Sequence, residues 1–373
     1  MLEKLAEFQY KYAGLIFLLT LLFTVSIGFG IQNLRLQTDL NKELPQNLNV
    51  IKLQNKASDL FGGADSVMLL IKLNKNCNTE GIKDIRDPKI IKMIISLANK
   101  AKEEPSVNSV QSVGSFFVSP ENIPENTEAV KMILSKIPDS ETFFNKDYSA
   151  TLMVVSADLG GSEEKIKKFV SRIHEDIESI EKPACIDINI TGNPPIRKVL
   201  MQMLRHDMVY TMLLAGIIIF ILLVFLKKSV IKALFVFTPL MLGLTWTLGL
   251  MGWLEIPLSI ATVGISAMIL GLGTEYGIFL VERYEEERKN KDQKASLITA
   301  LPSVGSGIIG SGTTTIVGFL ALLFAAMPMI QHLGETLALG IFCILFATVV
   351  VAPAVIICGE RITQGIRKHE KKN

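Results

Sequence analysis

The sequence predicts a polytopic α-helical membrane protein with six transmembrane helices and an α+β domain between the first two of them. Hydrophobic residues make up 49% of the 373 residues, and the mean hydropathy is +0.39. Six apolar stretches are each long enough to cross a bilayer. Between the first two stretches, strand-like and helix-like segments alternate, which indicates a sizeable aqueous domain.

Each predicted span rests on a run of about 20 mostly apolar residues. The first run is too long for the apolar core of a signal peptide, and no clean small-x-small cleavage site precedes the soluble segment, so we expect a retained anchor. Residues 1–12 precede this anchor, residues 32–207 separate it from a five-helix bundle at 208–358, and residues 359–373 form a tail. The spans are Ala13–Ile31, Met208–Leu226, Ala233–Trp253, Leu258–Val281, Val304–Ala326 and Leu333–Cys358.

Lysine and arginine in the short loops predict the orientation of the spans. These residues cluster between spans two and three, between spans four and five, and after span six, whereas the opposite short loops WLEIPL and MPMIQHLG contain none. We therefore expect both termini in the cytoplasm, residues 32–207 outside it, and the chain in the cell membrane as a multi-pass protein.

The segment at 32–207 contains a recognisable order of elements. Omitting the additional helix expected at 126–137, strand and helix signals follow the order β-α-β-β-α-β, which is the ferredoxin-like split βαβ pattern. Asp87 and Ser162 are the expected N-caps of its two main helices. The strands are expected at 66–73, 107–116, 148–159 and 185–192, and the helices at 87–104 and 162–180, after a first helix near 49–61.

Composition and motifs exclude several classes of site. A net charge of +2 without a basic run gives no reason to expect a nucleic-acid partner. The four cysteines are scattered, with no CxxC and no metal-ligand spacing, so no metal or other cofactor is expected. Cys77 and Cys185 could pair in an oxidising space, but we interpret them as two unpaired cysteines. A phosphate-binding G-x-x-x-x-G-K-[ST] loop is absent, and no soluble-enzyme motif occurs.

An acid inside span four is the main candidate for chemistry. Glu275 lies in SAMILGLGTEYGIFLVERYEEER, where residues 257–274 and 276–281 are uncharged. A carboxylate at such depth costs roughly 2.5–3.5 kcal/mol and is a default proton or ion site. The competing interpretation is an acid that reaches the cytoplasmic edge, but no Lys or Arg lies within one turn to pair with it. Tyr276 follows directly and could either relay a proton or only pack.

Small and hydroxylated residues surround this acid along the sequence. Glycine spacing in spans four and five permits close helix approach, although ordinary bundle packing also explains it. The threonines at 313–315 of span five could face Glu275, or they could only bond their own backbone carbonyls. The packing candidates are Gly271, Gly273, Gly277, Gly310 and Gly312, and the hydroxyl candidates for the proton relay are Thr313 and Thr314.

Several segments resemble one family. The run GLGTEYGIFLVERYEEE resembles the fourth-span signature of the MMPL and hydrophobe/amphiphile efflux-3 (HAE3) branches of the resistance-nodulation-division (RND) superfamily. FGGADSVMLLI resembles the early porter-domain strand of these proteins, TGNPPI the segment before their span two, and SGTTTIVGFLALL their span five. The resemblance implies a proton-driven exporter of lipids or other hydrophobic molecules, with a porter-type outer domain and a relay at Glu275 and Tyr276.

Two departures from the family pattern matter. Glu275 stands where the family usually has aspartate, which moves the carboxylate by one methylene. The usual protein also has twelve spans in two duplicated halves, whereas this chain has six spans and no internal repeat. We therefore expect a homodimer or higher oligomer in which the Glu275 helices approach each other near the axis.

Two alternative functions are also compatible with the sequence. One is a protein-translocation subunit like SecF, which shares the arrangement of one span, a loop and five spans. The other is a membrane protein that senses lipids or assists assembly and transports nothing. The sequence does not identify the substrate. The direction of transport and the coupling to H⁺ rather than Na⁺ are expectations that rest on the resemblance.

Overall fold

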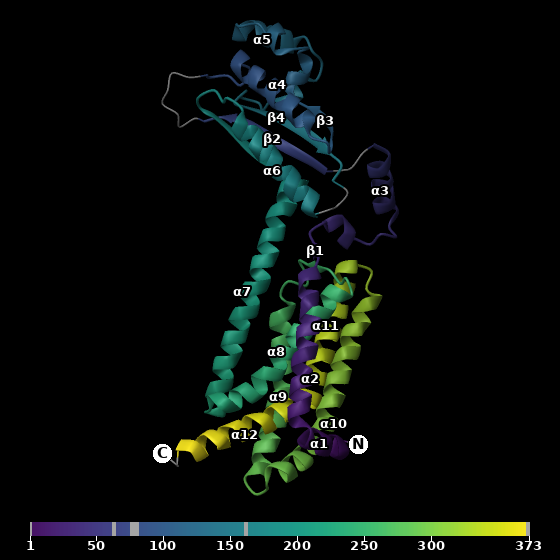
Figure 1. Cartoon of the computed structure of the whole chain (residues 1–373). Coiled ribbons are helices and arrows are strands. Elements are labelled where there is room, and N and C mark those ends of the chain that lie inside the picture. The colour runs from purple at the N-terminus through teal and green to yellow at the C-terminus, as the bar shows by residue number, and fades with distance from the viewer. Residues whose placement is uncertain (1, 62–64, 75–81, 160–162, 371–373) are drawn as a thin grey trace. The chain divides into compact units, whose positions relative to one another are not determined.

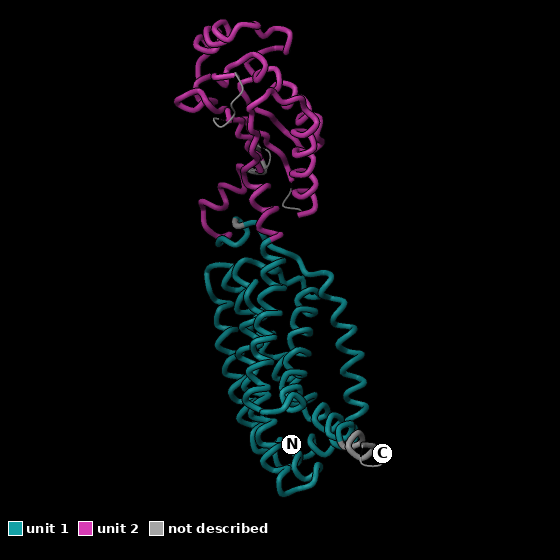
Figure 2. Tube along the Cα trace, turned by 90° about the vertical axis from the view of Figure 1, so that its left-hand side faces the viewer, with its two compact units in different colours: residues 1–45, 203–373 teal, residues 46–202 magenta. Residues whose placement is uncertain are grey.

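The chain forms two compact units (Figure 2). The computed structural model describes residues 2–61, 65–74, 82–159 and 163–370. Unit 1 comprises Met1–Pro45 and Met203–Asn373, and unit 2 comprises Gln46–Gln202. The compact unit between the first two spans is thus narrower than the segment at 32–207, because the residues on both flanks of that segment pack with the helices.

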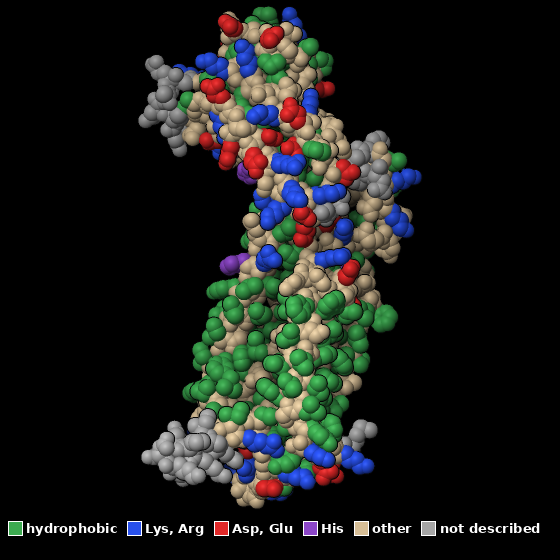
Figure 3. Space-filling view, in the orientation of Figure 1, with side chains coloured by type: hydrophobic (Ala, Val, Ile, Leu, Met, Phe, Trp, Pro, Cys, Tyr) green, Lys and Arg blue, Asp and Glu red, His purple; other side chains and the backbone are tan. Residues whose placement is uncertain are grey.

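The described residues contain six helices that are long and apolar enough to cross a membrane, as predicted (Figure 1). Hydrophobic side chains cover their visible outer surface (Figure 3). The helices are α2 (Ala13–Gly28) with η1 (Phe29–Asn33), α7 (Asn193–Lys227), α8 (Val230–Trp253), α9 (Ile265–Arg288), α10 (Gln293–Leu320) with η6 (Ala321–Phe324), and α11 (Pro328–Phe346) with a π-helical turn (Ala347–Val351) and α12 (Ala352–Glu370).

Several spans differ from their predicted limits: α10 begins at Gln293 rather than Val304, and α11 begins at Pro328 rather than Leu333. The fourth helix, α9, begins at Ile265 rather than Leu258, because β6 (Leu258–Ser259) pairs in parallel with β1 (Leu36–Gln37). It then continues through the acidic run to Arg288. The second spanning helix, α7, begins fifteen residues before the predicted Met208, so it is one continuous helix of 35 residues from Asn193 to Lys227.

Helices α8, α9, α10 and α11 pack against one another as the centre of unit 1. Close contacts at glycines hold them together: a Cβ built on Gly340 of α11 would stand 2.2 Å from Ile269 of α9. A Cβ built on Gly243 of α8 would stand 2.6 Å from Ile344 of α11. Small residues therefore set the helix spacing in this bundle, as is common in membranes.

The N-terminal helix α1 (Leu2–Lys11) packs on α10 and α12 and contacts the π-helical turn. Gln9 is fully buried, and its Nε2 donates to the carbonyl oxygens of Val349 at 2.9 Å and Val350 at 3.2 Å. Both carbonyls belong to the turn in which α-helical bonding is interrupted. Gln9 therefore satisfies backbone acceptors within the last span.

We expect Gln9→Leu to destabilise unit 1 by about 1–2 kcal/mol, because it leaves two buried carbonyls without this donor. The thermal unfolding midpoint of the purified chain in detergent measures the effect. Glu7→Gln is the matched control, since Glu7 is exposed on the same helix. Equal midpoints for Gln9→Leu and the wild type would show that the contact contributes nothing.

Unit 2 contains a four-stranded antiparallel sheet in the order β3-β4-β2-β5. Along the chain the main elements run β-α-β-β-α-β, as the sequence predicts. They are β2 (Asp65–Leu73), α4 (Pro88–Glu103), β3 (Val107–Gln111), β4 (Ala150–Ala157), α6 (Glu163–Ser179) and β5 (Ile186–Gly192). The predicted strand at 107–116 stops at Gln111, and η3 (Val113–Phe116) follows it.

One face of this sheet forms the core of unit 2. Alternate residues of β2 and β4 are buried, and they share an apolar cluster with both α4 and α6. Asp87 caps α4 by accepting from the backbone N–H of Lys89 at 2.9 Å, as predicted, whereas Ser162 lies outside the described residues.

The first helix, α3 (Asn49–Phe61), and α5 (Thr127–Ser135) occur where they were expected. Shorter elements are η2 (Leu40–Glu43) in unit 1 and η4 (Pro120–Asn122) and η5 (Ser140–Phe143) in unit 2.

The bonding state of one cysteine, Cys185, differs from the expectation. Cys185 is disulfide-bonded, so its interpretation as an unpaired thiol is wrong. Cys77 lies outside the described residues. Cys343 and Cys358 of the last span are free.

A polar cluster fixes the connection that leads into α4. Asp84 accepts from the Arg86 guanidinium at 2.7 Å and pairs with Lys131 of α5 at 3.1 Å. The Arg86 guanidinium also lies over the Tyr148 ring, 3.6 Å from its centroid. Burial alone would raise the pKa of Asp84, but the hydrogen bonds from Arg86 and Lys131 outweigh it and lower this pKa to about 2.

We expect this cluster to make unit 2 less stable at low pH. Since the folded pKa of Asp84 lies below its ordinary value of 3.8, the stabilisation is complete above pH 3.8 and disappears as the pH falls through 2. After allowance for solvent screening it amounts to about 1–2 kcal/mol. Thermal unfolding of wild type and Asp84→Asn, followed by circular dichroism from pH 6 to pH 2, should show midpoints that converge in acid. A constant difference would contradict this assignment.

Candidate proton site

Glu275 lies on the outward face of α9, exposed in the single chain. The same face carries exposed Met268, Leu272 and Phe279, while Tyr276 and Leu280 point into the bundle. The exposed positions 268, 272, 275, 279 and 282 repeat at alternating steps of four and three residues. We call these five residues the α9 outer stripe. This spacing is that of a helix seam that packs on another helix.

Tyr276 is the buried neighbour of Glu275 and faces α10. It is 1% exposed, and the hydroxyls of Thr315 and Ser311 lie near its phenol. Beside it lies a cleft of about 340 Å³ between the two helices. The cleft is lined by Tyr276, Phe279, Ser303, Val304, Gly307, Ile308 and Ser311. A buried phenol, two hydroxyls and an exposed carboxylate one residue away therefore meet at the α9–α10 boundary.

The hydroxyls of Thr313 and Thr314, which the sequence suggested for the relay, do not face the phenol of Tyr276. Thr313 and Thr314 are exposed on α10, and Thr314 donates to the backbone carbonyl of Ser311 at 2.8 Å. Thr315 donates to the same carbonyl at 2.9 Å. The hydroxyls near Tyr276 are those of Ser311 and Thr315, one helical turn apart. Residues spaced i,i+4 share one face of a helix, so this spacing in the sequence predicts that Ser311 and Thr315 lie on the same side of α10.

The five candidate glycines fall into two groups. A Cβ at Gly273 would stand 2.6 Å from Ile344, at Gly277 2.9 Å from Val236, and at Gly312 2.9 Å from Leu345, so these glycines permit contacts within the bundle. A Cβ built on Gly271 or Gly310 would have no atom within 4 Å. Gly271 and Gly310 lie on exposed parts of α9 and α10, beside the α9 outer stripe and Thr313–Thr314.

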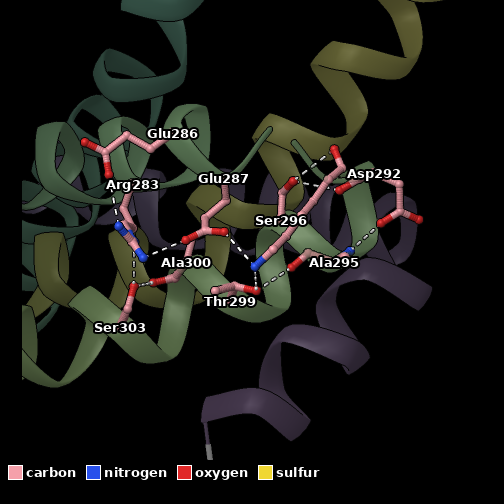
Figure 4. A network of polar contacts seen from close by, with 10 residues as sticks. Arg283, Glu286, Glu287, Asp292, Ala295, Ser296, Thr299, Ala300 and Ser303 are labelled. Carbon is pink, nitrogen blue, oxygen red and sulfur yellow. Dashed lines mark hydrogen bonds and ion pairs between the residues drawn. The ribbon is translucent and has the colours of Figure 1, made fainter. Parts of the chain in front are cut away.

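Ion pairs within the acidic run and hydrogen bonds to α10 fix the C-terminal end of α9 (Figure 4). Arg283 pairs with Glu286 and Glu287 and donates to Ser303 of α10 at 3.2 Å. Lys291 pairs with the same Glu287 at 2.7 Å and donates to Thr299. The acidic run is thus a helix in which acidic and basic side chains pair, and these contacts hold the turn between α9 and α10.

Two further ion pairs join this end of α9 to the helices before it. Lys227, the last residue of α7, pairs with Glu282 at 3.0 Å. Lys232 of α8 pairs with Glu285 at 3.3 Å. Glu282 of the α9 outer stripe is therefore a paired acid, in contrast to Glu275, two helical turns earlier. Among the described residues, no group of three or more His, Cys, Asp or Glu could hold a metal ion.

The sequence profile of the MMPL family matches residues 45–373, which is most of the chain. The chain belongs to the MMPL family. A membrane protein of Methanocaldococcus jannaschii is 34% identical over 365 residues, covering 96% of this chain and 94% of that protein. The similarity therefore extends over nearly the whole length of both chains.

Two mycobacterial relatives are much longer than this chain. The siderophore exporter MmpL5 of Mycobacterium tuberculosis is 26% identical over 205 residues, covering 53% of this chain and 21% of that protein. The sulfolipid-1 exporter MmpL8 of the same species is 31% identical over 98 residues, covering 26% of this chain and 9% of that protein. Members of the MMPL family are transporters rather than enzymes, and the chain is an MMPL protein of half size.

Proposed function

We propose that this MMPL protein is a proton-driven exporter of hydrophobic, amphiphilic or lipid molecules and that it works as a homodimer. The observation that carries the proposal is the position of Glu275 on the outside of a single bundle, at the middle of a span. Exposure of this carboxylate to lipid would cost roughly 2.5–3.5 kcal/mol. The cost falls if the carboxylate is protonated or if polar groups of a second protein surface pair with it.

The surface around Glu275 supports pairing with a second copy. The α9 outer stripe has the seam spacing of paired helices, and open glycines at Gly271 and Gly310 would let a partner helix approach closely. A two-fold axis beside this face would bring two Glu275 side chains and two Tyr276 clefts together. The relay would then consist of Glu275 and Tyr276 with Ser311 and Thr315, and it would involve Thr313 and Thr314 only through contacts with the partner.

Three observations support an outward-facing porter domain. The strand order β3-β4-β2-β5, with α4 and α6 packed against one face, supports a ferredoxin-like domain. Cys185 of this unit is disulfide-bonded, and disulfides persist mainly in oxidising compartments. The opposite ends of the spans carry Lys227, Arg283 and Lys291, as cytoplasmic ends do. We infer that both termini are cytoplasmic and that substrate passes outward.

Reconstituted vesicles test the function. Purified protein in vesicles with an imposed pH gradient should move a fluorescent lipid or amphiphile across the bilayer and release the gradient as it does so. A sodium gradient of the same size is the control for the coupling ion. Movement with sodium alone, or movement with no gradient dependence, would refute proton coupling. The relationship to the exporters MmpL5 and MmpL8 favours this function over a SecF-like or lipid-sensing one.

A further inference from the structure

A buried acid lies at the other end of the bundle, far from the α9–α10 turn. Glu43 ends the short 3₁₀ helix η2, which follows β1, and the strand β6 paired with β1 precedes α9. The start and the end of α9 are about 35 Å apart at 1.5 Å per residue. Glu43 is 4% exposed, and neither of its carboxylate oxygens has a hydrogen-bond partner among the described residues. A buried carboxylate without donors is costly.

The side chain that faces Glu43 is a histidine. His332 lies in the first turns of α11, and its Nδ1 stands 3.7 Å from Oε2 of Glu43. This distance is too long for a hydrogen bond but close enough for charge pairing, and this Nδ1 also has no hydrogen-bond partner among the described residues. The imidazole is 27% exposed and the carboxylate 6%, so His332 is the member of the pair that solvent reaches more readily.

The remaining charges near the pair are few. Asp39 and Lys42 share η2 and its cap with Glu43, and Glu335 follows His332 by one turn on α11. Among the described residues, the charge that acts on Glu43 is that of His332. Burial raises the pKa of Glu43, and the facing His332 offsets only part of this rise. The environment therefore favours a proton on this acid more than an ordinary carboxyl site does.

We propose that Glu43 and His332 form a second proton-binding site, which loads one proton from the compartment that the outer domain faces. With one proton the pair is either a neutral acid beside a neutral imidazole or a carboxylate beside an imidazolium, and both arrangements are uncharged overall. Without that proton, a buried carboxylate stands next to a neutral ring. The pair therefore titrates as a unit. This role in loading rests on the proposed proton-driven function, whereas the binding site itself does not.

The site lies apart from Glu275. Glu275 is ten residues into α9, which is about 15 Å from the start of that helix. His332 belongs to α11, which packs on both α9 and α10, the two helices that bear the Tyr276 cleft. Protonation of Glu43 changes the charge between η2 and the first turns of α11, so the pair can couple outer pH to the position of that helix.

Infrared difference spectroscopy of the full chain in detergent tests the site directly. Spectra recorded from pH 8 to pH 4 should contain a carboxyl band that is absent in Glu43→Gln and titrates above the ordinary value of 4.5. In His332→Gln the midpoint of this band should rise further, because the positive charge that favours the carboxylate is removed. Glu335→Gln, one turn along α11, should leave the midpoint unchanged. A midpoint in the ordinary range, or no shift in His332→Gln, would overturn the proposal.

Vesicle transport separates this site from the proposed function. Glu43→Gln should reduce transport and remove its dependence on outer pH, whereas Glu275→Gln should lose transport at every pH. If the infrared band behaves as expected but the wild type transports nothing, the proton site stands and the transport function fails. Glu43→Asp, which retains a carboxyl group, is the second variant if Glu43→Gln does not fold. Unchanged outer-pH dependence in a folded variant would contradict the loading role.

Discussion

Glu275→Gln should abolish proton-driven transport while the helical unit stays folded. The amide has nearly the size of the acid but cannot take up or release a proton, so we expect a loss on the order of a hundredfold or more. Stability should not fall, because the change removes an ionisable group from an exposed position at membrane depth. Transport by vesicles under a pH gradient, together with the thermal unfolding midpoint, measures both effects.

Two variants control this experiment. Glu282→Gln removes another acid of the α9 outer stripe, but Glu282 is paired with Lys227, so transport should persist. Glu275→Asp restores the residue that is usual in the family and keeps a protonatable group, so it should retain measurable transport. Full activity in Glu275→Gln would show that the proton is carried elsewhere.

Gly271→Leu should prevent pairing of two chains without unfolding either one. A Cβ at Gly271 has no atom within 4 Å, so a larger side chain fits the single chain. In the proposed dimer the same side chain would separate two helices that approach at small residues. We expect the variant to run as a folded monomer in native mass spectrometry and to lose transport.

Two further variants separate pairing from folding. Gly273→Leu, two residues away, should destabilise the bundle itself, because even a Cβ there would stand 2.6 Å from Ile344. Ile217→Trp enlarges an exposed residue of α7, and it should change neither assembly nor transport. A dimeric and active Gly271→Leu would place the interface on another face.

The six spans and the element order of unit 2 could be predicted because both depend on local patterns. Runs of apolar residues specify spans, and alternation with well-placed caps such as Asp87 specifies strands and helices. The start of α9 was missed because the apolar residues before Ile265 also suit a turn and the short strand β6, which pairs with β1. Pairing between segments so far apart leaves no local signal.

The sequence was sufficient to predict the acid Glu275 and the phenol Tyr276 of the candidate site, but not the residues around them. Glu275 is conspicuous because it is charged within an apolar run. The choice among the hydroxyls of α10 depends on the rotation of that helix, which directs Ser311 and Thr315 toward Tyr276 and leaves Thr313 exposed. Glu43 and His332 are 289 positions apart, and Gln9 and Val349 are 340 apart, so only the fold brings either pair together.

Disulfide formation between two copies tests the paired Glu275 site most directly. Leu272→Cys places a thiol on the α9 outer stripe of a chain in which Cys343 and Cys358 are replaced by alanine, and Leu18→Cys on exposed α2 is the control. A disulfide requires Cα atoms within about 7 Å. Mild oxidation in membranes should give a covalent dimer for Leu272→Cys and none for Leu18→Cys. A folded Leu272→Cys protein that stays monomeric would contradict the account.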